Sequence, residues 1–479
     1  MKALYRMLML SVILGNAGGA FAQTAPLSPD RPWHSKQEQQ IESDSTHFPE
    51  SRFSIEPDRT YSLAELIDLA EAHNPETRFA WESARAQLAA LGIARSELYP
   101  MIAAIALSQT DRGEANLGDR FYRQTEQAFE GALELNYTVF DFGARAGRIA
   151  IARAQLLAAD FAFNDVHRKL IYQVQHAFYA LLNAIGQEEA ARANLINAQT
   201  AQRAAEDRLS NGLATLPDVL EARSATAQAE YDLQAVLGAQ EIARGDLATA
   251  IGLTAKVPIR VQPLSEISTP ASIGDTVDQA MNRALQYRPD LLQQLAEVRS
   301  ANAMIKEARA AYYPTLNLSV APAAQSLYGL QQALPWAHTA DLTGSVTLNL
   351  SWTIFDGGAR RNRVAQAVAN RRQAEAQASV MRDEISNEVW TAYSNLKTAL
   401  RQRQSALALL DAATQSYAAT FESYKYGVRN FLDVTSAQRV LAQARSTDVL
   451  ARTQVLNAVA NLAFQTGDAI RSPARSARP

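Results

Sequence analysis

The side chains of this 479-residue chain that could do chemistry are not spaced for catalysis or for metal binding. There is no cysteine, which excludes disulfides, thiol catalysis and thiolate metal ligands. The six histidines (34, 47, 73, 167, 176 and 338) show no metal-ligand spacing, and no glycine-rich phosphate loop occurs. The paired glycines of FDGGAR (355–360) lack a following Lys-Ser/Thr, so a tight bend between strand and helix explains them better. We therefore expect no enzyme, no cofactor and no metal.

Two carboxylates are distinguished by their sequence context. Asp218 follows Gly212, and Asp433 follows Gly427 at the same spacing. Each glycine stands where the end of a helix needs a residue with positive φ. An aspartate just after such a turn is most often a helix N-cap, and both aspartates lie where an N-cap belongs. The residues alone therefore predict a capping role for both.

These turns belong to a sequence that repeats itself. Three motifs return at offsets of 214 or 215: ARSELYP (94–100) as ARAAYYP (308–314), YTVFDFGARAGR (137–148) as WTIFDGGARRNR (352–363), and NGLATLPDVLEA (211–222) as YGVRNFLDVTSA (426–437). A repeat of this length that occurs only twice indicates a duplicated domain rather than a solenoid. We place the two copies at 59–267 and 268–467.

Each copy begins with an amphipathic helix and continues with strand-like segments. The helices are predicted over 62–96 and 276–311, each with a break at a proline near its start, and a Tyr-Pro step ends both. Two segments of about ten residues follow in each copy. The clearest is 346–354, where apolar and polar side chains alternate strictly. Polar loops are predicted between the paired segments, at 110–130 and 323–341.

The period then changes from two to 3.5, which is the spacing of a coiled coil. Apolar or small side chains form one stripe in each copy: Ile149, Ala152, Leu156, Ala159, Phe163, Val166 and Leu170, and Val364, Ala367, Ala374, Ala378, Met381, Ile385 and Ala392. The stretch 359–426 has no Gly or Pro, and 144–211 has only Gly147 and Gly186. A continuous helix of that length would reach roughly 100 Å. Shorter helices are predicted to return at 218–250 and 433–465.

The alternating segments allow two interpretations. They suit a transmembrane barrel, but such alternation is commoner in ordinary half-buried antiparallel sheets. Residues 1–22 are typical of a secretory signal, with an apolar run too short to span a bilayer. No other apolar stretch approaches the roughly 20 residues of a membrane helix, so an exported chain would enter a membrane as strands. Four strands are too few for a barrel, so two, three or four copies would have to close it.

The ends of the chain and its charge add little to the functional interpretation. Residues 23–58 are expected to be an irregular extension, and residues 468–479 a disordered tail. Lys and Arg number 46 against 49 Asp and Glu, so the charge gives no argument for a nucleic-acid partner.

The signal, the two copies, the paired strands, the long helices and the twin turn and FD-G-AR motifs resemble the TolC-like outer-membrane efflux family over about 59–467. The resemblance implies an α+β membrane protein that forms a homotrimer. Its 12-stranded barrel would lie in outer-membrane lipid and continue as a long periplasmic α-helical coiled-coil tunnel. It would be the passive exit duct of a tripartite efflux or type I secretion system. Its partners would be a periplasmic membrane-fusion adaptor and an inner-membrane pump of the RND, ABC or MFS type.

The resemblance also implies roles for residues of the turns. Tyr424 and Arg429, by default helix-surface residues, would close a periplasmic gate with Asp218 as their acidic partner. Asp433 would form a constriction ring of carboxylates that favours cations. A modest interaction energy, on the order of 1–3 kcal/mol for each contact, would let a docking adaptor open the gate.

Other residues of the turns complete this assignment or depart from it. Gly212 and Gly427 would mark the helix-turn tips at which the adaptor docks. Some members of the family carry a second acid three residues after the ring, where this chain has Ser436, so only one ring is supported. Pro217 is a further departure, which would stiffen the first turn.

Two other functional classes are the alternatives. A periplasmic adaptor would show one helical hairpin and no strands of membrane length. A structural coiled-coil protein of the cell envelope would leave the alternating segments unexplained. The exported substrate and the pump class are not determined by the sequence, because selectivity lies in the pump.

Overall fold

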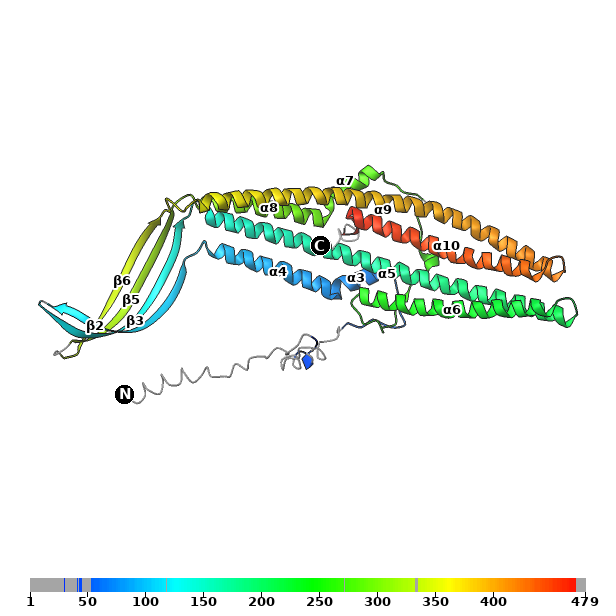
Figure 1. Cartoon of the computed structure of the whole chain (residues 1–479), viewed down its shortest axis with the longest axis horizontal. Helices are drawn as coiled ribbons and strands as arrows, with labels where there is room; N and C mark the ends of the chain where they lie inside the picture. The colour runs from blue at the N-terminus through cyan, green and yellow to red at the C-terminus, as the bar shows by residue number, and fades with distance from the viewer. Residues whose placement is uncertain are drawn as a thin grey trace. The chain divides into compact units, whose positions relative to one another are not determined.

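The computed structural model describes residues 53–470 apart from 118, 271 and 332–334, together with residues 30, 41, 43 and 44. The chain divides into two compact units after Ser54, and the fold described below is that of the unit from Ile55 onward (Figure 1). The predicted signal lies outside the described residues. In the predicted extension, residues 41, 43 and 44 are helical.

The unit contains twice the order of two short helices, two strands, a long helix and a returning helix. The first copy has β1 (Thr60–Tyr61), α3 (Leu63–His73), α4 (Pro75–Ser96), β2 (Met101–Leu117), β3 (Arg120–Phe140), α5 (Ala144–Ser210) and α6 (Leu216–Ala250), followed by β4 (Arg260–Val261) and η1 (Leu264–Glu266). The second copy has α7 (Val277–Tyr287), α8 (Pro289–Ala310), β5 (Thr315–Gln331), β6 (Ala337–Ser351), α9 (Ala359–Lys425) and α10 (Phe431–Thr466), followed by η2 (Asp468–Ile470).

The predicted helix breaks are confirmed at both prolines. Pro75 and Pro289 each occupy the first turn of a new helix, where a missing N–H costs nothing. The residue before each proline is extended, as proline requires. The last helical turn, η2, corrects a prediction: residues 468–470 were expected in a disordered tail. Asp468 instead accepts hydrogen bonds from Arg283 and Thr466, which order the turn.

The four long strands form one antiparallel sheet in the order β2-β3-β5-β6. The predicted loops at 110–130 and 323–341 are wrong, because pairing continues to Leu117↔Arg120 in one hairpin and to Gly329↔Ala337 in the other. A ladder needs only backbone groups, so the strands run on beyond the apolar alternation. The prediction of strand over 346–354 is also too long. β6 ends at Ser351, whose partner Thr315 follows a proline that cannot pair.

The FD-G-AR motif is the bend from strand to helix. Asp141 accepts hydrogen bonds from the backbone N–H groups of Gly143 (3.2 Å) and Arg145 (2.7 Å), and Asp356 does the same in the second copy. Gly143 has φ 94° and Gly358 φ 88°, a conformation that only glycine adopts without strain. The prediction of a tight bend is therefore confirmed.

The long helices α5 and α9 have 67 residues each and organise the packing of the others. Both predicted heptad stripes are confirmed, because all of their residues are buried or partly buried. The shorter helices of a copy follow one another along a long helix, α4 and α6 beside α5 (Figure 1). α8 packs between α5 and α9, and α10 occupies the same place further along. No helix among the described residues is long and apolar enough to cross a membrane.

Two glycines allow α5 to approach its neighbours closely. A Cβ atom at Gly147 would lie 2.9 Å from Cβ and 3.0 Å from Cα of Glu307 in α8. A Cβ atom at Gly186 would lie 2.6 Å from Cγ1 of Val449 in α10. Both distances are shorter than van der Waals contact, so these positions exclude any side chain unless the helices separate.

Gly147→Ala is expected to destabilise the protein by about 1–3 kcal/mol, because the new methyl group meets the backbone of α8. The matched control is Gly238→Ala in α6, where no atom lies within 4 Å of the new Cβ. There the gain in helix propensity is expected to stabilise by about 0.5–1 kcal/mol. Thermal unfolding of the purified variants in detergent measures both changes. Equal midpoints for the two variants would contradict the close approach of α5 and α8.

The returning helices end against the starts of the short ones. Gly252, which ends α6, lies at the start of α4, and a Cβ there would be 3.2 Å from Cα of Asn74. Gly467, which ends α10, packs in the same way on Tyr287. At this joint between helix ends in the first copy, Nδ2 of Asn74 donates a hydrogen bond to the carbonyl of Ala250 (3.0 Å), and both groups are neutral.

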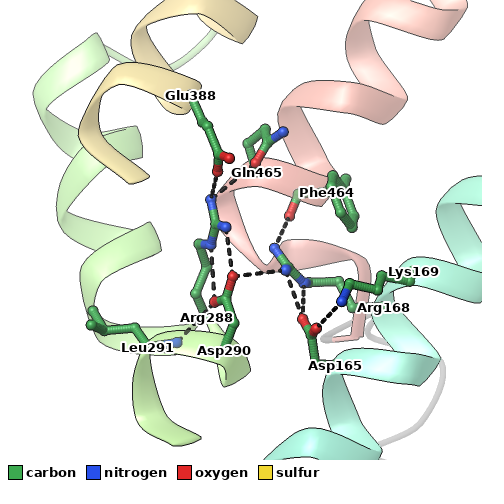
Figure 2. Close-up of polar contacts among 9 residues, drawn as sticks. All are labelled: Asp165, Arg168, Lys169, Arg288, Asp290, Leu291, Glu388, Phe464 and Gln465. Atoms are coloured by element: carbon green, nitrogen blue, oxygen red, sulfur yellow. Dashed lines mark hydrogen bonds and ion pairs between the residues drawn. The ribbon is translucent and has the colours of Figure 1, made fainter. Parts of the chain in front are cut away.

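The corresponding joint of the second copy is built from charged side chains (Figure 2). Arg288 stands where the first copy has Asn74, and its side chain is only 5% exposed. Its Nη1 donates to Glu388 (2.5 Å) and Gln465 (2.9 Å), and its Nε and Nη2 donate to Asp290 (3.1 and 2.6 Å). One guanidinium therefore ties the start of α8 to α9 and to the end of α10.

Arg168 of α5 completes this buried network. It donates to Asp165 (2.8 Å), to the backbone carbonyl of Phe464 (3.1 Å) and to Asp290 (3.1 Å), so two arginines share Asp290 (Figure 2). Burial by itself would raise the pKa of Asp290. The hydrogen bonds from Arg288 and the nearby charges of both arginines outweigh burial and lower it. The network thus joins α5, α8, α9 and α10 at one level along the helices.

Candidate functional site

The two turns between long and returning helices are built alike. Gly212 has φ 72° and Gly427 φ 78°, as predicted for glycines at helix C-termini. The backbone N–H of Leu213 donates to the carbonyl of Arg208 (2.7 Å), and that of Val428 to the carbonyl of Ser423 (2.9 Å). These backward hydrogen bonds satisfy carbonyls that the helix ends leave free. The turn geometry therefore follows from the glycines whatever the turns do.

Asp218 and Asp433 are not N-caps, which corrects that prediction. The N-caps are Thr215 and Asn430, and each aspartate lies three residues later, in the first turn. Asp218 accepts from the backbone N–H (2.9 Å) and the hydroxyl (2.7 Å) of Thr215. Asn430 accepts from the backbone N–H of Asp433 (2.9 Å). The helices start earlier than predicted because a short polar side chain precedes each one, and Pro217 fits the first turn of α6.

Tyr424 is buried, so its default placement on the helix surface is wrong. It is 3% exposed and belongs to an apolar cluster at the tips: Ala201, Ala205, Val219, Ala222, Tyr424, Phe431 and Val434. Its ring lies edge-on to Phe431, with 5.5 Å between centroids. Burial raises the pKa of Tyr424; the nearby charge of Arg208 opposes the rise, and that of Asp218 adds to it. The tyrosine hydroxyl is buried without a hydrogen-bond partner among the described residues.

Arg429 lies in the second turn with its side chain 61% exposed. Within one chain its Nη1 pairs with Asp433 at 3.5 Å, one helical turn away, rather than with Asp218. The structure therefore brings Tyr424 near Asp218 and Arg429 near Asp433. Sequence reasoning had grouped Tyr424, Arg429 and Asp218 together.

Sequence reasoning missed Arg208. This residue of the last turn of α5 donates to the backbone carbonyls of Tyr424 (2.8 Å), Lys425 (3.1 Å) and Leu213 (3.0 Å). Its guanidinium carbon also lies 4.9 Å from the centre of the Tyr424 ring. The sequence contained one indication of its role: the corresponding position of the second copy holds Ser423, a residue of a different type.

The outer surface of both turns is apolar. Large apolar side chains are exposed in each: Leu213, Leu216 and Leu220 in the first, and Tyr426, Val428 and Leu432 in the second. Clustered exposed apolar side chains of this kind are typical of a surface that binds another protein.

Three comparisons relate this geometry to known proteins. The family model described as "Outer membrane efflux protein" matches residues 66–253 and 280–468. Protein CyaE of Bordetella pertussis is 29% identical over 419 residues, 86% of this chain and 85% of that protein. Outer membrane protein OprJ of Pseudomonas aeruginosa is 25% identical over 382 residues, 79% of this chain and 78% of that protein. The solved outer-membrane channel OprN superposes with a TM-score of 0.74 at 21% identity and covers 86% of this chain and 93% of that one, a similarity of fold.

Proposed function

The chain belongs to the outer membrane efflux protein family, and from this premise we propose that three copies assemble into one duct through the outer membrane and the periplasm. The protein is an outer-membrane exit duct, through which substrates leave the cell passively. It works with an inner-membrane pump and a periplasmic adaptor, as part of tripartite efflux or type I secretion. The pump belongs to the RND, ABC or MFS class.

The unpaired edges of the sheet support assembly. β2 and β6 form the two edges, and they run in opposite directions because each neighbouring pair is antiparallel. β6 of one copy can therefore pair with β2 of the next and continue the pattern. Lipid admits no open sheet edge, and four strands cannot close a barrel. Three copies with four strands each make the twelve-stranded ring of the proposal.

The helices also have two margins, one formed by α4 and α6 and the other by α9, that expose apolar side chains suited to contact with another copy. α4 and α6 each pack on α5 with one side, and large apolar side chains are exposed elsewhere on them: Phe79 and Ile93 on α4, Tyr231 and Ile242 on α6. α9 packs on α8 and α10 and exposes Val380 and Trp390. In a closed ring the α9 margin of one copy faces the α4–α6 margin of the next. Burial of these apolar side chains would then stabilise the trimer.

The turns form the proposed gate. Tyr424, whose buried hydroxyl has no hydrogen-bond partner among the described residues, is the proposed phenol of the gate, because buried hydroxyls are almost always hydrogen-bonded. The exposed Arg429 can likewise reach an acid such as Asp218 of a neighbouring copy. Asp433, multiplied by a threefold axis, gives the proposed ring of three carboxylates. The tips at Gly212 and Gly427, with their exposed apolar side chains, are the proposed docking surface for the adaptor.

The duct is tested by conductance. In planar bilayers we expect a small, cation-preferring conductance, and heat-resistant trimers in outer-membrane fractions. Asp433→Asn is expected to lower the cation preference, because a neutral ring no longer attracts cations. Asp246→Asn, an exposed aspartate near the end of α6, is the control and should change nothing. A soluble periplasmic monomer without conductance would overturn the proposal.

A further inference from the structure

Arg208 crosses from one helical hairpin to the other within a single chain. It belongs to the last turn of α5, and two of its three carbonyl acceptors, Tyr424 and Lys425, belong to the last turn of α9. The third, Leu213, belongs to its own turn. One side chain therefore contacts both turns of the site, and it leaves its Nε buried without a partner among the described residues.

The acceptors make this contact strong. The last carbonyls of a helix have no partner within the helix and carry the negative end of its dipole. A guanidinium supplies a fixed, permanently charged fork of donors, which a lysine cannot reproduce. Arg208 also covers the face of the Tyr424 ring, 4.9 Å from its centre, and its guanidinium partly offsets the rise in the pKa of Tyr424 that burial causes. It therefore holds both the backbone and the ring of Tyr424.

Only the first copy has an arginine that makes this contact. At the offset of the repeat, Ser423 stands where the first copy has Arg208, and its hydroxyl donates to Ala419 in its own helix (2.8 Å). The apolar cluster at the tips is shared by both hairpins, and the hydroxyl of Thr435 in α10 also donates to Glu221 in α6 (3.2 Å). Arg208 supplies the hydrogen bonds that join the ends of the two long helices.

We propose that Arg208 is a latch within each copy. It holds the end of the α9–α10 hairpin against the α5–α6 hairpin and so positions Tyr424 for closure of the gate. Opening the duct requires its bonds to Tyr424 and Lys425 to break. The inference rests on the proposed function, and it adds a residue and a contact inside one copy to a gate otherwise formed between copies.

Arg208→Met tests the latch, with Arg203→Met as the matched control on the exposed face of the same helix. The full-length protein is purified, and hydrogen–deuterium exchange is followed for peptides covering 417–431. Arg208→Met is expected to accelerate exchange about tenfold, which is the loss of roughly one charged hydrogen bond. It is also expected to raise the planar-bilayer conductance, while the thermal midpoint of the trimer stays near that of wild type. Arg208→Lys should restore both readouts in part.

The outcomes of these experiments distinguish failure of the latch proposal from failure of the proposed exit duct. Unchanged exchange in Arg208→Met overturns the contact. Faster exchange with unchanged conductance overturns its role in closure. If wild type itself does not conduct, the exit duct fails, and exchange still decides whether Arg208 holds the tips. Because the hydrogen bonds of Arg208 to α9 go to backbone carbonyls, its effect on exchange should persist in a Tyr424→Phe background, and loss of the effect there would also overturn the proposal.

Discussion

Arg288→Met is expected to lower the free energy of unfolding by about 2–4 kcal/mol. The variant removes the guanidinium that joins α8 to α9 and α10 and leaves Asp290 with Arg168 alone. Breaking a buried ion pair costs about 3–5 kcal/mol, and the effect here is smaller because Glu388 is 44% exposed and can be hydrated. Thermal midpoints at equal scan rate measure the change.

The control for this prediction is Arg309→Met, an exposed arginine in the last turn of the same helix. It should leave the midpoint within about 1 °C of wild type, since exposed charges contribute little. Arg288→Asn introduces the residue of the first copy's joint. It should still destabilise, because asparagine is too short to reach both Glu388 and Gln465. A midpoint for Arg288→Met equal to that of Arg309→Met would show that the network contributes nothing to stability.

The pH dependence of the same comparison follows from Asp290. Its pKa is lowered in the folded protein, so its contribution is present above its ordinary pKa of about 3.9 and is lost as the pH falls through the lower folded value. The difference between wild type and Arg288→Met should therefore be constant from about pH 5 to pH 8 and shrink below about pH 4.

The double variant Tyr424→Phe with Arg429→Ser is expected to raise the conductance of the duct several-fold. Phenylalanine keeps the ring packing with Phe431 and removes only the hydroxyl, and serine removes the charge proposed to bind Asp218 of a neighbouring copy. In the proposed gate each of these contacts is worth on the order of 1–3 kcal/mol, which is enough to shift a closed–open equilibrium by tenfold or more. Single-channel recording in planar bilayers gives the conductance and the open probability.

A control for the gate comes from the same turn. Tyr426→Phe with Lys425→Ser also removes one hydroxyl and one cation, but Tyr426 is 82% exposed and Lys425 pairs with Glu422 in its own helix. We expect wild-type conductance, because the backbone carbonyl that Arg208 binds at Lys425 is kept. An unchanged conductance in the gate variant would remove Tyr424 and Arg429 from the gate.

The secondary structure was predictable because its causes are local. The breaks at Pro75 and Pro289, the bend after each FD motif and the two 67-residue helices all follow from neighbouring residues. Strand lengths and helix starts were less accurate. Strand ends were misplaced because a strand has no distinctive composition beyond its apolar alternation. The start of α6 was misplaced because Asp218 was taken for the N-cap, although Thr215 stands three residues earlier.

The candidate site was predictable only in part. The glycines of the turns and the motif positions of Tyr424, Arg429, Asp218 and Asp433 were recognised from the sequence. The burial of Tyr424 was not, because it depends on side chains from four helices that meet only in the folded chain. The pairing of Arg429 with Asp433 was not predicted, although the two residues lie one helical turn apart.

By itself, then, the sequence determined the duplicated order of helices and strands, the bends and the conformation of the turns. These depend on periodicity, proline and glycine, which act over a few residues. Only the tertiary structure decided that Arg208 reaches the end of α9, and that Arg168 and Arg288 share Asp290 although the two arginines lie far apart in the chain. Such contacts join residues that are distant in sequence, and whether an arginine is exposed or buried depends on what the other helices place beside it.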